Sequence, residues 1–339
     1  MDSEIASWKS TRTYIDEVPP PGANIVSGMW IFRGFDFLHT FSPTPKMTTL
    51  RVLLHAAAYR DYELLSLDFS TAFLQGSLRE EIWLRCPPGF IGSFPAGTQW
   101  SLRRPVYGLR QAPREWHDTV RTTLAALGFA PSTADPSLFL PTNTTLPPFY
   151  VLLYVDDLVF ATADTEALAH VKSELQKRYT CTDLGPSPPQ STPLPTGHSL
   201  SAPPSDESVE PSGPTSGMGL VLGGRARVVL TGQADTSWVD DLATQRSSKG
   251  YTFSLGSGSV SWRSTRSSFV LSSSCEADIY AGAMAAQELR WLTYLLTDLG
   301  EAPRSPPVLY VDNKAMLALC QEHRLEHRTK HISLRYFLA

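Results

Sequence analysis

The chain has 339 residues, enough for about two domains of ordinary size. Its 42% hydrophobic and 18% charged residues are typical of a globular protein and exclude a wholly disordered or fibrous chain. The net charge of −4 excludes a chain-wide basic field for nucleic acid, so any nucleic-acid surface must be local.

The cysteines indicate the compartment. They are widely scattered, with neither zinc-ligand spacing nor a disulfide framework: Cys86, Cys181, Cys275 and Cys320. We therefore expect free thiols in a reducing, intracellular compartment. The sequence does not distinguish the cytoplasm from the nucleus. Met1–Ser10 lacks the layout of a signal peptide, and the longest apolar run, Phe149–Val155, is too short to span a bilayer.

One segment differs in composition from the rest. Gly185–Ser216 contains 9 Pro and 8 Ser among its 32 residues and no Phe, Trp or Tyr. Such a segment cannot bury enough apolar surface to offset its ordering entropy, which predicts a disordered linker. The linker divides the chain into a first block, 1–184, and a second block, 217–339.

Apolar spacing and capping residues predict three helices and three strands in the first block. The helices are Thr48–Tyr59, Ala112–Leu127 and a segment that runs from Asp164 as its cap to about Tyr179. The strands are Leu64–Phe69, Tyr150–Leu153 and Leu158–Ala161. The last two strands predict a hairpin with two acidic residues at its turn.

The second block reads as strands followed by alternating helices and strands. The first three strands are Arg225–Thr231, Gly250–Leu255 and Ser259–Arg263, with Gly256–Gly258 as the turn between the last two. The later elements are a helix over Ser274–Leu299 ended by Gly300, a strand over Val308–Val311 and a helix over Asn313–Cys320. This order predicts a mixed sheet covered by helices, and an α+β chain as a whole.

Acidic residues follow several of the apolar strands. They are Asp68, Asp156, Asp157, Asp235 and Asp312, and Glu276 begins the long helix. A lone Asp in such a place is more often a turn or cap residue than a ligand. Two adjacent acids in an apolar hairpin repel each other, and Mg²⁺, which prefers carboxylate oxygen, would remove that repulsion.

Ten ordered motifs surround these acids. In the first block they are Thr40–Pro43 (TFSP), Leu67–Gly76 (LDFSTAFLQG), Pro105–Trp116 (PVYGLRQAPREW) and Leu153–Asp157 (LYVDD). In the second block they are Ala234–Trp238, Arg246–Tyr251, Ser261–Trp262, Leu271–Ala277, Tyr310–Asn313 and Arg328–His331. Through these motifs the chain resembles the reverse transcriptase and RNase H region of copia-type LTR retrotransposon polyproteins. The resemblance implies a palm-like domain followed by an RNase H-like mixed-sheet domain.

The resemblance implies a polymerase site in the first block. Asp68, Asp156 and Asp157 match the acids that hold two Mg²⁺ ions, with Mn²⁺ as a substitute, and the substrates would be an RNA template, a DNA primer and a dNTP. Phe73 matches the bulky residue that excludes a ribonucleotide 2′-OH, although core packing is the commoner role of one Phe. Gln111 resembles a residue of the dNTP pocket. The nearby arginines would contact phosphate, or instead form a solvated helix face: Arg110 and Arg114.

The resemblance also implies a ribonuclease site in the second block. Asp235, Glu276 and Asp312 match three of the four carboxylates that hold metal ions and cleave the RNA of an RNA–DNA hybrid. His331 lies in a family motif, and we expect a surface or structural role for it.

The chain departs from the family at three joins. Trp30–Arg33 meets Gly34–Phe37 where the family carries a fingers segment with a basic strand, and Asp183–Gly185 meets the linker where thumb-like elements follow. The third join, at Ser212–Gly219, lies where the connection region is expected. The chain also ends before the family's last strand, which carries the fourth ribonuclease carboxylate and would pack against a terminal helix at about Ile332–Leu338.

Three functions stay open at this point. The first is an RNA-directed DNA polymerase with RNase H activity, impaired by the missing segments and working by itself or as part of a larger polyprotein. Alternatively, the chain is a catalytically silent retroelement fragment. The third reading is a module that binds RNA–DNA hybrids without turnover, supported by basic residues interleaved with Tyr107 and Trp116: Arg103, Arg104, Arg110 and Arg114.

Overall fold

The computed structural model describes residues 8, 10–23, 25–26, 42–85, 99–143, 147–187, 220, 222–223, 229–256 and 258–322. The chain divides into two compact units, which are described separately. The first consists of Met1–Lys46 and Glu63–Ser187, and the second of Met47–Tyr62 and Pro188–Ala339. The α+β class predicted from the sequence is confirmed, whereas the domain boundaries at 184 and 217 stay a prediction.

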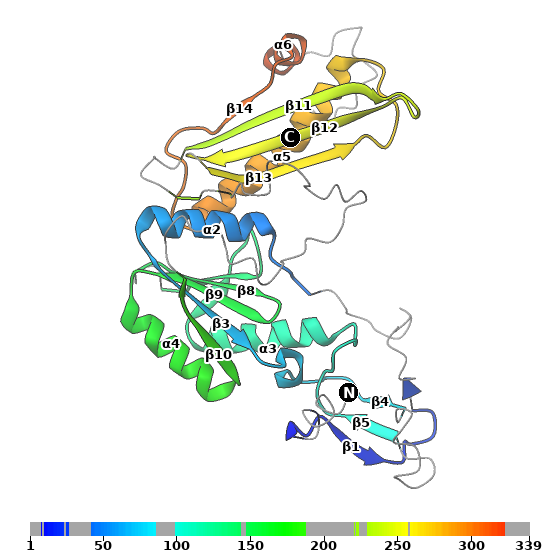
Figure 1. Cartoon of the computed structure of the whole chain (residues 1–339), viewed down its shortest axis with the longest axis vertical. Helices are drawn as coiled ribbons and strands as arrows, with labels where there is room; N and C mark the ends of the chain where they lie inside the picture. The colour runs from blue at the N-terminus through cyan, green and yellow to red at the C-terminus, as the bar shows by residue number, and fades with distance from the viewer. Residues whose placement is uncertain are drawn as a thin grey trace. The chain divides into compact units, whose positions relative to one another are not determined.

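A six-stranded sheet forms the body of the first unit, with strand order β10-β3-β9-β8-β7-β6 (Figure 1). Its strands are β3 (Glu63–Phe69), β6 (Phe129–Pro131), β7 (Leu138–Pro141), β8 (Phe149–Tyr154), β9 (Asp157–Thr162) and β10 (Cys181–Ser187). β8 and β9 pair antiparallel, which confirms the predicted hairpin. β3 and β9 lie inside the sheet, and each buries apolar residues, among them Leu64 and Leu67 in β3 and Leu158 and Phe160 in β9.

Two helices pack on this sheet through apolar faces. They are α3 (Ala112–Ala126) and α4 (Thr165–Arg178). Asp164 caps α4 as predicted, because its carboxylate accepts a hydrogen bond from the Ala167 N–H at 2.9 Å. One continuous core joins the sheet, both helices and the single turn η1 (Ala72–Gln75), with Trp116, Val120 and Leu175 among its members.

A second, smaller sheet in the first unit was not predicted. Its order is β1-β5-β4-β2, with β1 at Tyr14–Glu17, β2 at Ile25–Val26, β4 at Ile82–Leu84 and β5 at Gln99–Leu102. Trp100 anchors this sheet, since its ring stacks on Tyr14 at 4.2 Å and meets Trp8 edge-on at 6.1 Å. Residues from this sheet and from the six-stranded sheet belong to the same core.

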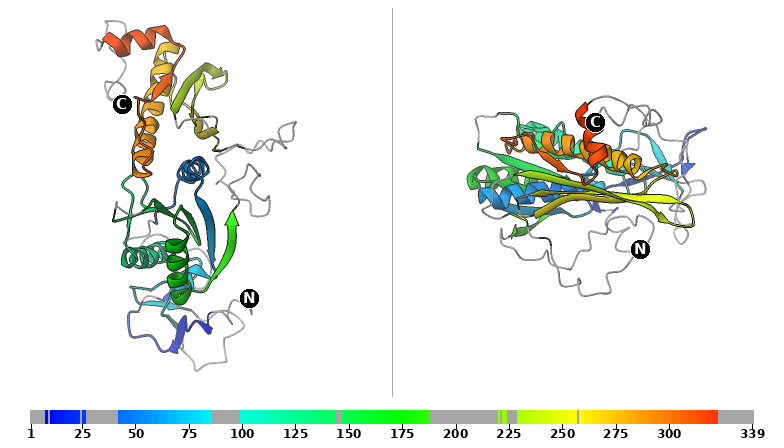
Figure 2. Two further views of the ribbon diagram at one scale, coloured as in Figure 1. Left: turned by 90° about the vertical axis from the view of Figure 1, so that its left-hand side faces the viewer. Right: turned by 90° about the horizontal axis from the view of Figure 1, so that it is seen from above.

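The second unit is a four-stranded sheet covered by a long helix. The strand order is β13-β12-β11-β14, with β11 at Leu230–Asp241, β12 at Arg246–Leu255, β13 at Gly258–Arg266 and β14 at Val308–Tyr310. The helix α5 (Ser274–Asp298) runs along one face of the sheet (Figures 1 and 2). Gly232 of β11 has no side chain because the Phe253 ring occupies that space, 2.2 Å from where a Cβ would lie.

Two further helices among the described residues belong to the second unit. α2 (Met47–Arg60) lies beside β13, where the Arg51 guanidinium stacks over the Trp262 ring at 3.9 Å. α6 (Lys314–Glu322) packs on α5 through Met316, which contacts Ile279. No helix among the described residues is long and apolar enough to cross a membrane.

Several sequence expectations need correction or lie outside the described residues. β11 begins at Leu230 and continues to Asp241, so Asp235 lies inside a strand rather than after one. Gly185–Ser187, the first three residues of the predicted linker, form the end of β10. Residues 188–216, the predicted terminal helix and His331 are outside the description, as are the joins at 30–37 and 212–219.

The buried His117 of α3 predicts a loss of stability in mild acid. Burial lowers its pKa below the usual 6.5, although the nearby Asp118 carboxylate opposes this. The unfolded chain therefore takes up a proton at a higher pH than the folded chain, so the stabilisation is present above about pH 6.5 and falls as the pH drops. Urea denaturation between pH 7.5 and 5.5 measures the free energy of unfolding of the parent chain and of His117→Gln. As the pH falls, this free energy should decrease more steeply in the parent chain, by up to about 1.4 kcal/mol per pH unit more than in the variant.

The exposed His170 of α4 supplies the control for this measurement. His170→Gln removes an exposed histidine and leaves the buried His117 in place. The free energy of unfolding of this variant should therefore depend on pH as it does in the parent chain. Equal pH slopes for the parent and His117→Gln would contradict the prediction.

Candidate active sites

The predicted polymerase acids lie at one edge of the central strands of the first unit. Asp68 in β3 stands directly opposite Asp157 in β9, and Thr182 of β10 is its neighbour on the other side. The Phe69 N–H donates to the Asp156 carbonyl at 2.9 Å. The structure thus brings the backbones of all three acids together, although their carboxylate oxygens are not within 4.8 Å of one another as a group.

The loop that carries Asp156 is under backbone strain. Val155 and Asp156 form the two-residue connection between β8 and β9, and Val155 has a φ of 57°. A positive φ is costly for a β-branched residue and persists only where the surroundings impose it. Here the Trp116 indole N–H donates to the Val155 carbonyl at 2.8 Å, so the core helix α3 holds the loop in place.

Phe73 has features of both of its proposed roles. It is 9% exposed and belongs to the core of the first unit, where its ring lies 4.5 Å from that of Tyr107. It also lines a small cavity of about 30 Å³ beside the strained loop. The other lining residues are Ser42, Pro43, Thr44, Pro113, Trp116, His117, Leu153 and Val155. Core packing is therefore established for Phe73, and selection against a 2′-OH stays a prediction.

Gln111 and Arg110 lie side by side with opposite burial. Gln111 is 2% exposed, and its amide donates to the Glu80 carboxylate at 3.3 Å. Its side-chain oxygen is buried and has no hydrogen-bond partner among the described residues. Arg110 is exposed, and the described residues offer it no ion pair.

The expected aromatic and basic surface is only partly present. Trp116 is 1% exposed and Tyr107 is half-buried against Phe73, so neither aromatic ring forms an open stacking surface. The other arginines have partners within the chain. Arg103 pairs with Glu17, Arg104 donates to the Leu74 carbonyl, and Arg114 pairs with Asp118.

A second acidic cluster occupies the second unit. Asp235, Asp278 and Asp312 each offer a carboxylate oxygen within 4.8 Å of the others, and no further such group occurs among the described residues. β11 and β14 are parallel neighbours, which brings Asp235 and Asp312 to the same side of the sheet. Asp278 reaches them from the start of α5.

Glu276 is not part of this cluster. Its carboxylate accepts from the Ser272 N–H at 2.8 Å and from the Ser272 hydroxyl at 2.7 Å. Its own N–H donates to the hydroxyl of Ser273, the residue that caps α5. Glu276 therefore helps to cap the helix, in the manner of a capping box.

Asp278 is the member of the acidic cluster that sequence reasoning missed. It accepts hydrogen bonds from the Thr236 hydroxyl and, at 2.7 Å, from the Asn313 amide. These donors immediately follow Asp235 and Asp312, so they tie Asp278 to both other acids. The sequence signal for it was a second acid two positions after Glu276, directly following the Leu271–Ala277 motif.

The chemistry of the second cluster fits a hard divalent cation. Three carboxylates close together repel one another, and Mg²⁺ and Mn²⁺ bind preferentially to oxygen ligands of this type. Two of the three carboxylates belong to exposed residues and are open to solvent on one side.

Comparison with known proteins gives a family match. Residues 19–188, half of the chain, match the family model described as "Reverse transcriptase (RNA-dependent DNA polymerase)". The chain is 28% identical to the Retrovirus-related Pol polyprotein from transposon RE2 of Arabidopsis thaliana, and the match covers 99% of this chain and 30% of that polyprotein. It is 27% identical to the polyprotein from transposon TNT 1-94 of Nicotiana tabacum, over 92% of this chain and 30% of the relative.

A solved structure and the alignment length add two observations. A foamy viral protease-reverse transcriptase in complex with ds DNA is similar at a TM-score of 0.42 and 12% identity, over 81% of this chain and 54% of that one. The chain spans about 30% of the length of the transposon polyproteins that it matches. The match to the Arabidopsis polyprotein extends over 446 residues, whereas this chain has 339.

Proposed function

Because this chain belongs to the reverse transcriptase (RNA-dependent DNA polymerase) family, we propose that it is the polymerase and RNase H region of a copia-type retrotransposon polyprotein. The family match and the transposon relatives confirm the resemblance found in the sequence. The proposed substrates are an RNA template, a DNA primer and a dNTP. The observation that carries the polymerase function is the register of Asp68 opposite Asp157, next to the Asp156 loop.

In the proposed polymerase centre, Asp68 and Asp156 would hold divalent metal, and Asp157 would assist them. Mg²⁺ or Mn²⁺ would supply the charge that stabilises the attacking and leaving oxygens of a phosphoryl transfer. The chain's own contribution is position. The β3 and β9 backbones fix Asp68 and Asp157, while Trp116 holds the strained loop so that Asp156 stays beside Phe69.

In the proposed RNase H centre, Asp235, Asp278 and Asp312 would hold divalent metal against a phosphodiester of an RNA–DNA hybrid. The clustering of carboxylate oxygens supports Asp278 as the third acid in place of Glu276, whose carboxylate is engaged at the start of α5. Variants that replace each carboxylate by an amide distinguish Asp278 from Glu276 as the third acid. Asp278→Asn should abolish hybrid cleavage, whereas Glu276→Gln, which can still accept from Ser272, should reduce it far less.

We further propose that polymerisation by this chain is slow. Transfer of a phosphoryl group depends on positioning and on stabilisation of charge, so metal ligands alone are insufficient. The alignment of 446 residues against a chain of 339 supports the inference that relatives carry segments absent here. The sequence places one such gap where a basic strand would meet the triphosphate.

A single-nucleotide extension assay tests the polymerase proposal. The full chain is incubated with an RNA template, a labelled DNA primer, Mn²⁺ and the next dNTP. We expect slow addition that Asp156→Asn abolishes, since this change keeps the shape of the side chain and removes its charge. Rapid addition would contradict the proposed impairment.

A catalytically silent fragment is the alternative function. It is favoured by one observation, that the carboxylates of Asp68, Asp156 and Asp157 are not gathered within 4.8 Å. Absence of any Asp156-dependent addition, with hybrid binding retained, would establish this alternative and overturn the polymerase proposal.

A further inference from the structure

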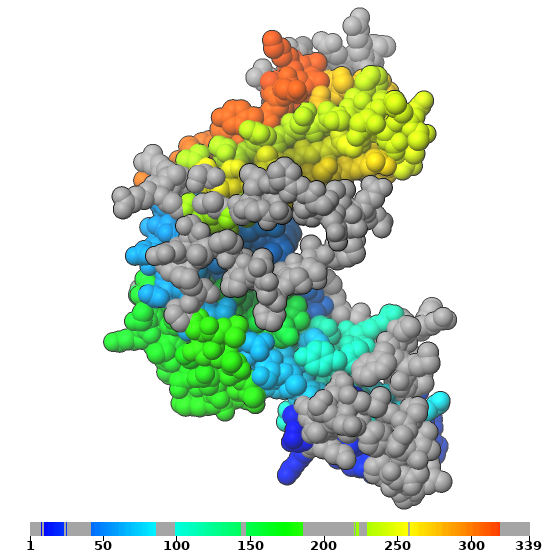
Figure 3. All heavy atoms as spheres, viewed as in Figure 1, coloured from blue at the N-terminus to red at the C-terminus, as the bar shows by residue number. Residues whose placement is uncertain are grey.

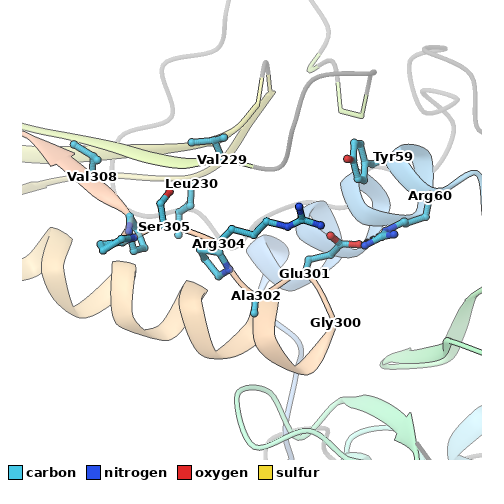
Figure 4. Close-up of a pocket in the computed structure, with 13 residues that line it drawn as sticks. Tyr59, Arg60, Val229, Leu230, Gly300, Glu301, Ala302, Arg304, Ser305 and Val308 are labelled. Carbon is cyan, nitrogen blue, oxygen red and sulfur yellow. Dashed lines mark hydrogen bonds and ion pairs between the residues drawn. The ribbon is translucent and has the colours of Figure 1, made fainter. Parts of the chain in front are cut away.

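A cavity in the second unit lies apart from the acidic cluster of that unit. Its volume is about 460 Å³, within the range of small-molecule sites (Figure 4). Three segments line it: the end of α2, the start of β11 and the connection from α5 to β14. The lining residues that matter here are Tyr59, Arg60, Val229, Glu301 and Arg304.

The backbone around the cavity is fixed by two helix ends. α5 ends in a Schellman motif, because Gly300 has a φ of 70°, the Glu301 N–H donates to the Leu296 carbonyl at 2.8 Å and the Gly300 N–H donates to the Thr297 carbonyl at 3.0 Å. The Glu301 carboxylate, whose side chain is 9% exposed, then pairs with Arg60 at the end of α2. The connection continues through Pro303, Pro306 and Pro307, whose rings restrict the backbone. The cavity is therefore largely preformed.

The cavity carries one positive charge that the described residues do not neutralise. Glu301 compensates Arg60, and the resulting hydrogen bond raises the pKa of Arg60. Arg304 is exposed and has no ion pair among the described residues. Figure 4 shows the Arg304 side chain extending toward Glu301 and Arg60, over the cavity. This arrangement favours a ligand with an anionic group.

The remaining walls suit the uncharged part of a nucleotide. Val229, Val308 and Pro303 supply apolar surface, and Tyr59 supplies an aromatic ring, one face of which lies 5.7 Å from the Arg60 guanidinium. Ser305 adds a hydroxyl to the rim. A free inorganic anion would use Arg304 alone and leave these surfaces unoccupied.

The position of the cavity links it to the acidic cluster of the same unit. The cavity lies at the start of β11 and β14, and Asp235 lies five residues farther along β11 than Leu230, which corresponds to about 16 Å. Double-stranded DNA advances about 3.4 Å per nucleotide along its axis, so this span is on the order of five nucleotides of a duplex. Gln233 and Tyr310, which are neighbours in the parallel pair and both exposed, lie between the two places. Strands β11 (yellow-green) and β14 (orange) reach the surface in Figure 3.

We propose that this cavity binds one nucleotide of the strand that occupies the RNase H centre, about five nucleotides from the scissile bond. Its phosphate pairs with Arg304, and its sugar and base rest on Tyr59 and the apolar wall. The inference rests on the proposed function, because it takes the Asp235 cluster as the place where the hybrid is cut.

Binding of a fluorescent RNA–DNA hybrid to the full chain in EDTA tests the proposal without turnover. Arg304→Ala should weaken affinity by about tenfold, the size expected for one charge-assisted contact. It should also reduce the slope of log K against log salt by about 0.9. Arg290→Ala, which removes an exposed charge from the side of α5, should change neither quantity appreciably. Equal losses of affinity in Arg304→Ala and Arg290→Ala would overturn the proposed nucleotide site. Failure of the parent chain to bind any hybrid would overturn the proposed function as well.

Modification of arginine by phenylglyoxal, read by peptide mass spectrometry, locates the contact. The hybrid should protect Arg304 and leave Arg290 reactive. Inorganic phosphate at the same phosphate concentration should protect neither. Equal protection of Arg304 by inorganic phosphate would show a simple anion site and overturn the assignment to a nucleotide.

Discussion

Saturating Mn²⁺ is expected to raise the melting temperature of the full chain by about 5–10 °C, through the acidic cluster of the second unit. Asp235, Asp278 and Asp312 hold their carboxylates within 4.8 Å in the folded state only, so metal binds the folded chain and stabilises it by mass action. Mn²⁺ at one hundred times its Kd adds about 2.7 kcal/mol to the free energy of unfolding. For a domain of this size, that energy corresponds to a rise in melting temperature of this order.

The same variant series tests the cause of this shift. Asp235→Asn should melt higher than the parent chain without metal, because it removes one of three repelling charges, and it should lose the response to Mn²⁺. Asp240→Asn changes a nearby carboxylate outside the cluster and should keep the metal response. A Mn²⁺ shift of equal size in the parent and in Asp235→Asn would show that the cluster does not bind the ion.

Replacement of Trp116 is expected to have the largest effect in the first unit. Trp116 packs edge-on against Phe69 and Tyr179, and its N–H satisfies the carbonyl of the strained Val155. Trp116→Ala should cost about 3–5 kcal/mol through the lost core volume. Trp116→Phe retains an aromatic ring, so it should cost only about 1–3 kcal/mol through the unpaired carbonyl.

The functional consequence of Trp116→Phe should exceed its effect on stability. Without the indole donor, the Val155–Asp156 connection is free to leave its positive φ, so amide exchange in the 149–162 hairpin should accelerate and primer extension should fall by more than tenfold. Trp83→Phe makes the same change in β4 and should leave the hairpin exchange unaltered. Unchanged exchange in the Trp116→Phe hairpin would show that the indole does not hold the loop.

Local patterns predicted the elements that local chemistry specifies. Asp164 predicted the start of α4, and Gly300 predicted the end of α5. Two apolar runs around adjacent acids predicted the β8–β9 hairpin. In each case a cap, a glycine in the left-handed region or a short turn acts within a few residues. These features are legible in a single sequence.

The missed strands depend on partners that lie far away in the sequence. β1 is a strand because it pairs with β5, more than 80 residues later, and its own four residues carry no period. β10 contains Gly185 and Pro186, which read as a linker. It is an edge strand with an irregular register there, the setting in which a strand tolerates proline.

The candidate sites too were predictable where local sequence patterns specify them and not where they depend on distant contacts. The register of Asp68 and Asp157 followed from two apolar strands that had to pair centrally, and Asp235 and Asp312 followed from family motifs. The place of Asp278 rather than Glu276 in the acidic cluster did not follow, because it depends on which of the two acids is engaged with Ser272 and Ser273 at the start of α5. The Arg304 cavity joins three distant segments and has no sequence motif at all.

The central claim is that one chain carries two separate centres, each with its own acids. A single reaction with an RNA–DNA primer–template, dNTPs and Mn²⁺ reports both, when gels resolve primer extension and RNA cleavage from separate labels. Asp156→Asn should abolish the slow extension and leave cleavage intact, and Asp235→Asn should abolish cleavage and leave extension intact. Loss of both activities in either variant, or persistence of an activity after loss of its own acid, would contradict this account.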